Sequence, residues 1–162
     1  MAYEVVDNFL PEDQFKALQE TMMGVHFPWY YNKGIAYEED DNFQFIHNFY
    51  NHEKFSPFMP ILKPLIGKIN PSMLYRAKAN LGIRTSTNQE SGWHTDFQKE
   101  DLICKTAVFY INTNDGFTLF KDGEKVPSLE NRFVVFDSPT VHTGVSQTNT
   151  DRRVLINLNF DL

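Results

Sequence analysis

Hydrophobic and polar residues alternate with a helical period near the start of the chain. In residues 11–24, Phe15, Leu18 and Met22 recur three or four positions apart, which places them on one face of an α-helix. A proline opens this segment, two acidic residues follow it, and a glycine comes after its end. These are the boundary signals of a helix, so the pattern predicts an amphipathic helix here.

A second helix is predicted from residue 56. Ser56 is a residue type that caps helix N-termini, and Pro57 suits the first helical position. Pro64 lies further along the same segment. Because proline lacks the backbone N–H of the helical ladder, we expect it to kink or shorten this helix.

The remaining segments have the period and composition of strands. They are short, rich in β-branched and aromatic residues, and separated by turns rich in Asn, Asp and Gly. The predicted strands are 3–9, 43–50, 73–81, 106–112, 117–120, 132–137, 141–145 and 152–160. Helices followed by many short strands predict an α+β, mainly β fold, with antiparallel sheets or a barrel carrying the N-terminal helices on one sheet. The length of 162 residues predicts a single domain spanning 1–162.

The last predicted strand, "RRVLINLNF", has two different faces. Successive side chains of a strand point to opposite sides. One face therefore carries Val154, Ile156, Leu158 and Phe160, and the other carries Arg153, Leu155, Asn157 and Asn159. We expect the apolar face to pack under the helices and the mixed face to look into a cleft. Arg153 then points inward, where a guanidinium suits bidentate binding of a carboxylate, and Arg152 points away.

Composition narrows the classes of function. The formal net charge is -6 and there is no basic stripe, which disfavours a nucleic-acid partner. The single cysteine excludes an internal disulfide framework and suits a reducing compartment. The N-terminus lacks the basic and apolar regions of a signal peptide, and no apolar run is long enough to span a membrane. We therefore expect a cytoplasmic location without membrane association.

The stretch "SGWHTDF" carries the candidate chemistry. His94 and Asp96 are two residues apart, so on an extended backbone both project from one face. By itself the pair could equally be an exposed polar turn, because short motifs match often by chance. His142 lies in "SPTVHTGV" at the start of a late strand. Two histidines and one carboxylate with open positions opposite them form the facial triad of non-haem Fe(II) oxygenases.

Several motifs, taken in order, resemble a known family. They are "HTD", "FYIN", "DGFTLF", "NRFVVFDSPTVHTG" and "RRVLINLNF". In this order and spacing the chain resembles the 2-oxoglutarate-dependent Fe(II) oxygenases, especially the prolyl-4-hydroxylase-like branch and its compact phage and bacterial forms. The resemblance covers residues 73–162 well and the N-terminal half loosely. It implies a double-stranded β-helix, or jelly roll, and a dioxygenase that hydroxylates its substrate and releases succinate and CO2.

The resemblance also implies roles for individual residues. His94, Asp96 and His142 match the iron ligands, and Arg153 matches the basic residue that pairs with the far carboxylate of 2-oxoglutarate. Tyr110 matches a tyrosine that donates to the same carboxylate, and Asn80 falls near a polar co-substrate contact. The implied cofactors are Fe(II) and 2-oxoglutarate as co-substrate, with ascorbate as an optional reductant.

Two positions depart from the family pattern. Asp115-Gly116 replaces the usual pair of glycines, and Leu155 stands where a small residue is common. Both departures concern the shape of the pocket more than the metal ligands.

Two other functions stay open at this point. The chain could be a non-catalytic jelly-roll protein, either metal-binding or structural, such as one of a phage. If the chain is encoded by a phage, the expected location is the host cytoplasm. It could also be a nucleic-acid demethylase of the same fold, but that branch has a second arginine where this chain has Asn159. The substrate, a peptidyl residue, an amino acid or a small metabolite, and the oligomeric state are not indicated by the sequence.

Overall fold

Two antiparallel sheets form most of the protein. The computed structural model describes residues 3–36, 42–96 and 104–162. Within these ranges the larger sheet has the order β1-β9-β6-β11-β5-β3-β2, with β4 paired to β3. Its strands are β1 (Tyr3–Val6), β2 (Tyr30–Lys33), β3 (Phe43–Asn51), β4 (Lys54–Phe55), β5 (Met73–Ile83), β6 (Lys105–Tyr110), β9 (Phe133–Asp137) and β11 (Arg152–Asp161). The smaller sheet has the order β10-β7-β8, with β7 (Phe117–Phe120), β8 (Lys125–Pro127) and β10 (His142–Val145).

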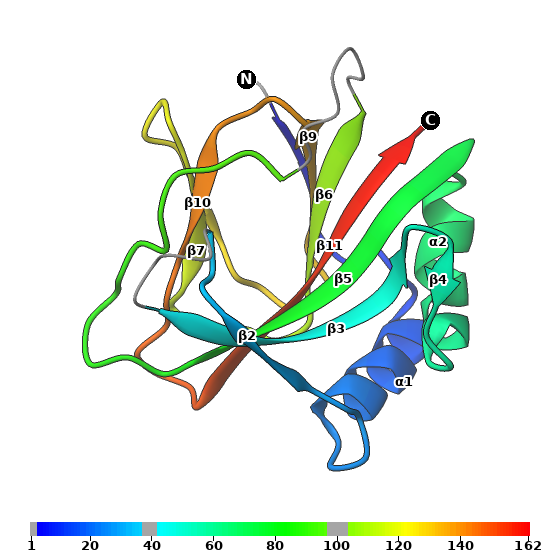
Figure 1. Ribbon diagram of the computed structural model, residues 1–162, viewed down its shortest axis with the longest axis horizontal. Helices are drawn as coiled ribbons and strands as arrows, with labels where there is room; N and C mark the ends of the chain where they lie inside the picture. The colour runs from blue at the N-terminus through cyan, green and yellow to red at the C-terminus, as the bar shows by residue number, and fades with distance from the viewer. Residues whose placement is uncertain (1–2, 37–41, 97–103) are drawn as a thin grey trace.

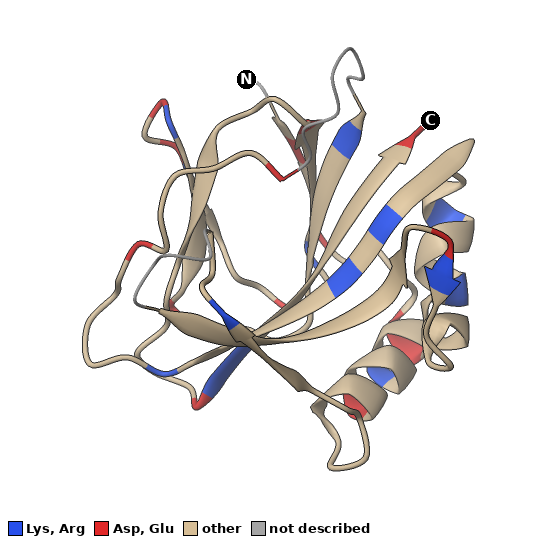
Figure 2. Ribbon diagram, viewed as in Figure 1, with Lys and Arg blue, Asp and Glu red and all other residues tan. Residues whose placement is uncertain are grey.

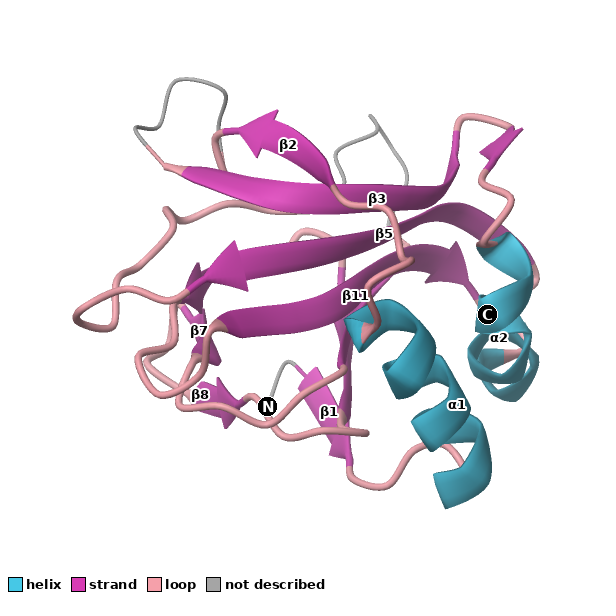
Figure 3. Cartoon of the chain, turned by 90° about the horizontal axis from the view of Figure 1, so that it is seen from below, coloured by secondary structure: helices cyan, strands magenta, loops and turns pink. Residues whose placement is uncertain are grey.

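The helices cover the outer face of the larger sheet. Figure 1 shows α1 (Glu12–Met23) and α2 (Lys63–Ile69) on one side of β3, β5 and β11, and the smaller sheet on the other side. Figure 3, seen from below, shows the same layers. The arrangement is the double-stranded β-helix that the sequence predicted, with helices packed on one sheet.

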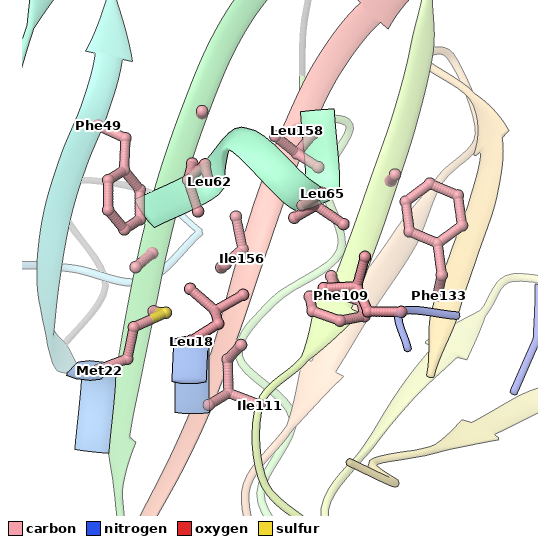
Figure 4. Close-up of a cluster of buried hydrophobic side chains, with 14 of the residues drawn as sticks. Leu18, Met22, Phe49, Leu62, Leu65, Phe109, Ile111, Phe133, Ile156 and Leu158 are labelled. Carbon is pink, nitrogen blue, oxygen red and sulfur yellow. The ribbon is translucent and has the colours of Figure 1, made fainter. Parts of the chain in front are cut away.

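The main hydrophobic core lies between the helices and β11. The apolar face of β11 is buried there, as are the three residues of the apolar stripe of α1. Figure 4 shows Leu18 and Met22 of α1, together with Leu62 and Leu65, directed toward Ile156 and Leu158 of β11. The alternation of β11 therefore separates the core from the interior space between the sheets, as predicted.

The second helix begins later than predicted. Residues Met59–Leu62 form a 3-10 turn and α2 continues from Lys63. Ser56 does not cap this helix; its Oγ accepts the Phe58 N–H at 3.0 Å and lies 2.7 Å from Nε2 of His47. Pro64 occupies the first turn of α2, where a missing N–H has no cost. The α-helix is shorter than predicted because it begins at the turn that contains Pro64, not because it ends there, and the predicted N-cap at Ser56 was wrong.

Three short strands were not predicted. β2 reads "YYNK", with three exposed residues and one half-buried residue, so it shows no inside–outside alternation. It exists because it pairs with β3, where Tyr30 lies opposite Ile46. β4 and β8 are two and three residues long and also depend on a partner strand. Such strands carry too few residues for a period to be recognised.

Neither helix could span a membrane. In the described ranges, no helix is both long and apolar enough to cross one.

Ile156 tests the assignment of the core. It is fully buried in the central strand, so Ile156→Ala removes apolar contacts and leaves a cavity. We expect the free energy of unfolding, measured by urea denaturation, to fall by about 2–5 kcal/mol. Val25 is 93% exposed, and Val25→Ala, the matched control, should change it by less than about 0.5 kcal/mol. Equal losses in the two variants would contradict this core.

Candidate metal centre and cavity

Backbone hydrogen bonds join the two histidines of the predicted triad. The N–H of His94 donates to the carbonyl of His142 at 3.0 Å, and the N–H of His142 donates to the carbonyl of His94 at 3.0 Å. Nearby, Glu90 and Val145 form a second isolated bridge. These contacts hold the segment before Asp96 against β10, so residues 48 positions apart become direct cross-strand partners.

The side chains of the triad converge on one point. Nε2 of His94 lies 3.6 Å from Oδ1 of Asp96, and Nε2 of His142 lies 3.5 Å from Oδ2 of Asp96. One ligand atom from each of the three residues lies within 4.8 Å of the others. The structure thus brings together the three residues that the sequence analysis selected.

The opposite ring nitrogens are fixed by backbone carbonyls. Nδ1 of His94 lies 3.0 Å from the oxygen of Gly92, and Nδ1 of His142 lies 3.0 Å from the oxygen of Thr140. With the ring hydrogen on Nδ1, Nε2 keeps its lone pair toward Asp96. This is the outer-shell arrangement that orients metal-ligating histidines.

The surroundings of Asp96 favour its ionised form. Burial of this carboxyl opposes ionisation, but contacts with His142, His94 and Arg76 hold its pKa well below the usual range. One guanidinium nitrogen of Arg76, Nη2, lies 3.5 Å from Oδ1 of Asp96. Oδ2 of Asp96 is buried without a hydrogen bond. An ionised carboxylate with an oxygen still to be satisfied, beside two oriented imidazoles, fits a divalent metal of the Fe(II) type.

The triad opens into a cavity between the two sheets. Its volume is about 330 Å³, and it is lined by residues of β5, β10 and β11, by the segment that carries His94, and by Val108 and Thr118. Asn80, predicted as a co-substrate contact, is in this lining, and its Oδ1 is buried without a hydrogen bond. The cavity therefore offers polar groups next to the metal ligands.

Arg153 lines the cavity and Arg152 does not. Nε of Arg153 donates to Oγ of Ser128 at 2.9 Å, which fixes the guanidinium, while Nη2 is buried with no hydrogen-bond partner. Burial lowers the pKa of Arg153 from its ordinary value. Nη2 of Arg152 instead donates to the carbonyl of Met23 at 2.7 Å, at the end of α1. The two arginines thus lie on opposite sides of the sheet.

Tyr110 lies behind the cavity wall. It is fully buried, its ring is 5.6 Å from the guanidinium carbon of Arg153, and its hydroxyl is 2.6 Å from Oγ1 of Thr118. Thr118 lines the cavity, whereas Tyr110 is not among the lining residues. Direct contact between Tyr110 and a co-substrate stays a prediction; in this structure Tyr110 supports the two side chains in front of it.

The Asp115-Gly116 departure has a structural explanation. A Cβ on Gly116 would lie 2.9 Å from Cδ of Arg153 and 2.8 Å from the carbonyl oxygen of Val145, so a side chain cannot fit there. The Asp115 carboxylate accepts the Thr148 N–H at 2.7 Å and thereby fastens the turn before β11. Gly116, beside Arg153, keeps the glycine of the family pattern. Asp115, which replaces the other glycine, holds the turn through its hydrogen bond from Thr148.

Several cavity residues were missed by the sequence analysis. Arg76 and Lys78 line the cavity with Asn80 because the three alternate along β5. Gln147 also lines it, and its Oε1 is buried without a hydrogen bond. Asn157, which the predicted faces of the last strand directed into the cleft, lines the cavity as expected, and its Oδ1 is likewise buried without a hydrogen bond. The alternation of "MLYRAKANL" places Arg76, Lys78 and Asn80 on one face of this strand. That alternation was the available signal, but it did not by itself show that this face lines a cavity.

Comparisons of the sequence with known proteins give no match. No family model matches the chain, and no curated protein matches it.

Comparisons of the structure do find similar folds. A viral collagen prolyl hydroxylase from Paramecium Bursaria Chlorella virus-1, in its 2OG complex, has a TM-score of 0.66 and 12% identity, over 100% of this chain and 97% of that one. A prolyl hydroxylase from Trichoplax adhaerens, in complex with a hypoxia-inducible factor peptide, has a TM-score of 0.69 and 14% identity, over 99% and 84%. The α-ketoglutarate-dependent carbocyclase SnoK of nogalamycin biosynthesis has a TM-score of 0.69 and 14% identity, over 99% and 79%.

These similarities extend over nearly the whole chain. At such identities they establish the fold. The protein has the double-stranded β-helix fold of the prolyl hydroxylases and other 2-oxoglutarate- and Fe(II)-dependent oxygenases.

Proposed function

We propose that the protein is an Fe(II)- and 2-oxoglutarate-dependent oxygenase that hydroxylates its substrate. One observation carries the proposal: the His94–Asp96–His142 triad opens into the same cavity as Arg153, whose Nη2 is buried without a partner. A metal-binding protein without this chemistry has no need for a fixed, buried cation beside its metal ligands. The shared fold raises the expectation of this activity but does not name a substrate.

The residues present fit both cofactors. His94, Asp96 and His142 would hold Fe(II), and Arg153 would bind the far carboxylate of 2-oxoglutarate through a charge-assisted hydrogen bond. Bound together, iron and 2-oxoglutarate would use O2 for oxidative decarboxylation to succinate and CO2, with one oxygen atom of O2 going to succinate and the other to the hydroxylated substrate C–H bond. Ascorbate is an optional reductant in this scheme.

The protein itself contributes orientation and exclusion of water. Ser128 and the ring of Tyr110 fix the guanidinium of Arg153, so little side-chain entropy is lost when a carboxylate binds. The side chains of Val108 and Leu155 form an apolar part of the cavity lining. Leu155, the second departure from the family pattern, lines the same cavity as Arg153.

The substrate class is part of the same proposal. A peptidyl residue, an amino acid or a small metabolite would fit, since a cavity of about 330 Å³ lies at the lower end of ligand pockets. The Trichoplax adhaerens enzyme is in complex with a peptide, which illustrates one way of presenting a residue to such a site.

Removal of the triad carboxylate should abolish metal binding. We expect one Co(II) per chain in the wild type, and an affinity loss of more than about a hundredfold in Asp96→Ala, because even outer-shell changes cost 10- to 100-fold. Absorption spectroscopy of the Co(II) protein gives the affinity. His26→Ala is the matched control, since His26 is exposed and outside the triad. Unchanged affinity in Asp96→Ala would show that the metal binds elsewhere.

The two neighbouring arginines should differ in their effect on 2-oxoglutarate. Arg153→Ala removes a buried charge-assisted bond and should weaken 2-oxoglutarate by about 30-fold or more, which is about 2–4 kcal/mol. Arg152→Ala should cost less than about 1 kcal/mol. Calorimetric titration of the anaerobic Fe(II) protein measures both. An equal loss in both variants would exclude Arg153 as the specific anchor.

Succinate formation separates the oxygenase from a non-catalytic jelly-roll protein. With Fe(II), 2-oxoglutarate and O2 but no substrate, the wild type should release succinate slowly, because that reaction needs only the triad and Arg153. His142→Ala, assayed in parallel, should release clearly less. If the metal-loaded wild type neither binds 2-oxoglutarate nor forms succinate on prolonged incubation, the protein is a binding module.

A further inference from the structure

Two basic side chains on β5 enter the cavity in addition to Arg153. Arg76 and Lys78 both line it, and they lie opposite Asn159 and Asn157 in the pairing of β5 with β11. Figure 2 shows the basic residues of β5 as blue bands on the strand beside β11. Nη2 of Arg76 lies 3.5 Å from Oδ1 of Asp96, whereas Arg153 pairs with Gly82, further along β5.

Arg76 is only partly satisfied by the protein. Its Nε donates to Oδ1 of Asn159 at 2.9 Å, which fixes the guanidinium. Its Nη2 lies 3.5 Å from Oδ1 of Asp96 and is buried without a hydrogen bond. The side chain is therefore held in place with donor capacity left toward the cavity.

The charge of Lys78 has fewer polar partners than that of Arg76. Among the described residues, its ammonium group forms no hydrogen bond or ion pair. Burial, followed by repulsion from Arg76, lowers its pKa to about 8, and Asp96 only partly offsets this. The amide oxygen of Asn157, its cross-strand partner, is also buried without a hydrogen bond. An unpaired ammonium and an unpaired amide thus share one side of the cavity.

The charges around the cavity do not balance. Its described lining contains three permanently or mostly cationic residues, Arg76, Lys78 and Arg153, against Asp96 and the exposed Glu90. A divalent metal together with Arg153 would be matched by Asp96 and the dianionic co-substrate. Among the residues that the structure describes, Arg76 and Lys78 would still lack a counter-charge. A protein with a formal net charge of -6 has no general excess of cations that would explain this pair.

Burying uncompensated charge is costly unless a ligand satisfies it. We propose that the primary substrate is a small organic acid whose carboxylate or phosphate group is bound by Lys78 and Arg76. The inference rests on the proposed function, since it assigns this acid to the cavity beside the metal ligands. Because Arg76 also contacts Asp96, the carbon that is oxidised lies within a few bonds of the anionic group.

Thermal unfolding of metal-free protein tests the anion site without requiring activity. Inorganic phosphate and acetate are titrated separately, with NaCl keeping the ionic strength constant. The Arg153→Ala background removes the co-substrate cation, and wild-type protein is measured in parallel in case that background folds poorly. We expect a saturable rise in Tm of about 3–6 °C at ten times the Kd of the effective anion. A response to acetate alone indicates a carboxylic acid, and a stronger response to phosphate indicates a phosphorylated one.

The variants of Lys78 decide the assignment. Lys78→Met should lose the rise, whereas Lys78→Arg, which keeps the charge, should retain it. Lys54→Met, in which an exposed lysine of β4 is replaced, should respond like its parent. A full rise in Lys78→Met, or no rise in the parent proteins, would overturn the proposal.

Binding of 2-oxoglutarate keeps this test separate from that of the proposed function. In the anaerobic Fe(II) protein, Lys78→Met should bind 2-oxoglutarate within about twofold of wild type, because Arg153 is unchanged. Loss of 2-oxoglutarate binding in Lys78→Met would overturn the proposal by making Lys78 part of the co-substrate site. If the wild type itself does not bind 2-oxoglutarate, the proposed function fails, and the anion result still decides whether Lys78 binds an acid.

Discussion

The candidate site depends on the reciprocal backbone hydrogen bonds between His94 and His142. Each residue donates its N–H to the other's carbonyl, so the two imidazoles are attached to neighbouring backbones of fixed separation. Asp96 then needs only the two-residue spacing of an extended chain to reach both rings. Metal ligands on a loop alone would have many relative positions. The pairing with β10 removes this freedom before any metal binds, so the triad is preformed.

The β5–β11 pair links this site to the stability of the domain. One face of β11 is buried under α1 and α2, and the other face lines the cavity with Arg153, Leu155 and Asn157. Because the side-chain period of a strand is two, a shift of the register by one residue would move Arg153 into the core and Ile156 into the cavity. The hydrophobic core therefore fixes the orientation of Arg153, the proposed anchor of the co-substrate. Packing under the helices and chemistry between the sheets are two consequences of the same alternation.

The cavity is unusual in its charge. Three cations line the interior of an acidic protein, and one of them, Arg76, lies 3.5 Å from the buried carboxylate of Asp96. Two of them are held by a neighbouring side chain: Arg153 donates to Ser128, and Arg76 donates to Asn159. Positive charges fixed in this way are arranged before a ligand arrives, so an anionic ligand meets donors that need little reorganisation. The same arrangement weakens the empty fold, since unpaired charge at low dielectric is unfavourable.

The sequence by itself determined the fold class, the first helix, most strands, the faces of the last strand and the selection of His94, Asp96 and His142. These follow from periodicity and from residue types that act over a few positions. It could not determine the start of the second helix or the strands β2, β4 and β8, because these depend on a partner rather than on their own pattern. Only the tertiary structure decided that Tyr110 lies behind the cavity lining, that Thr118 is part of that lining, and that Arg76 and Lys78 line the same cavity as the candidate metal ligands. Local periodicity says which side chains share a face of a strand; which face is enclosed is decided by the other sheet, and its residues are distant in the chain.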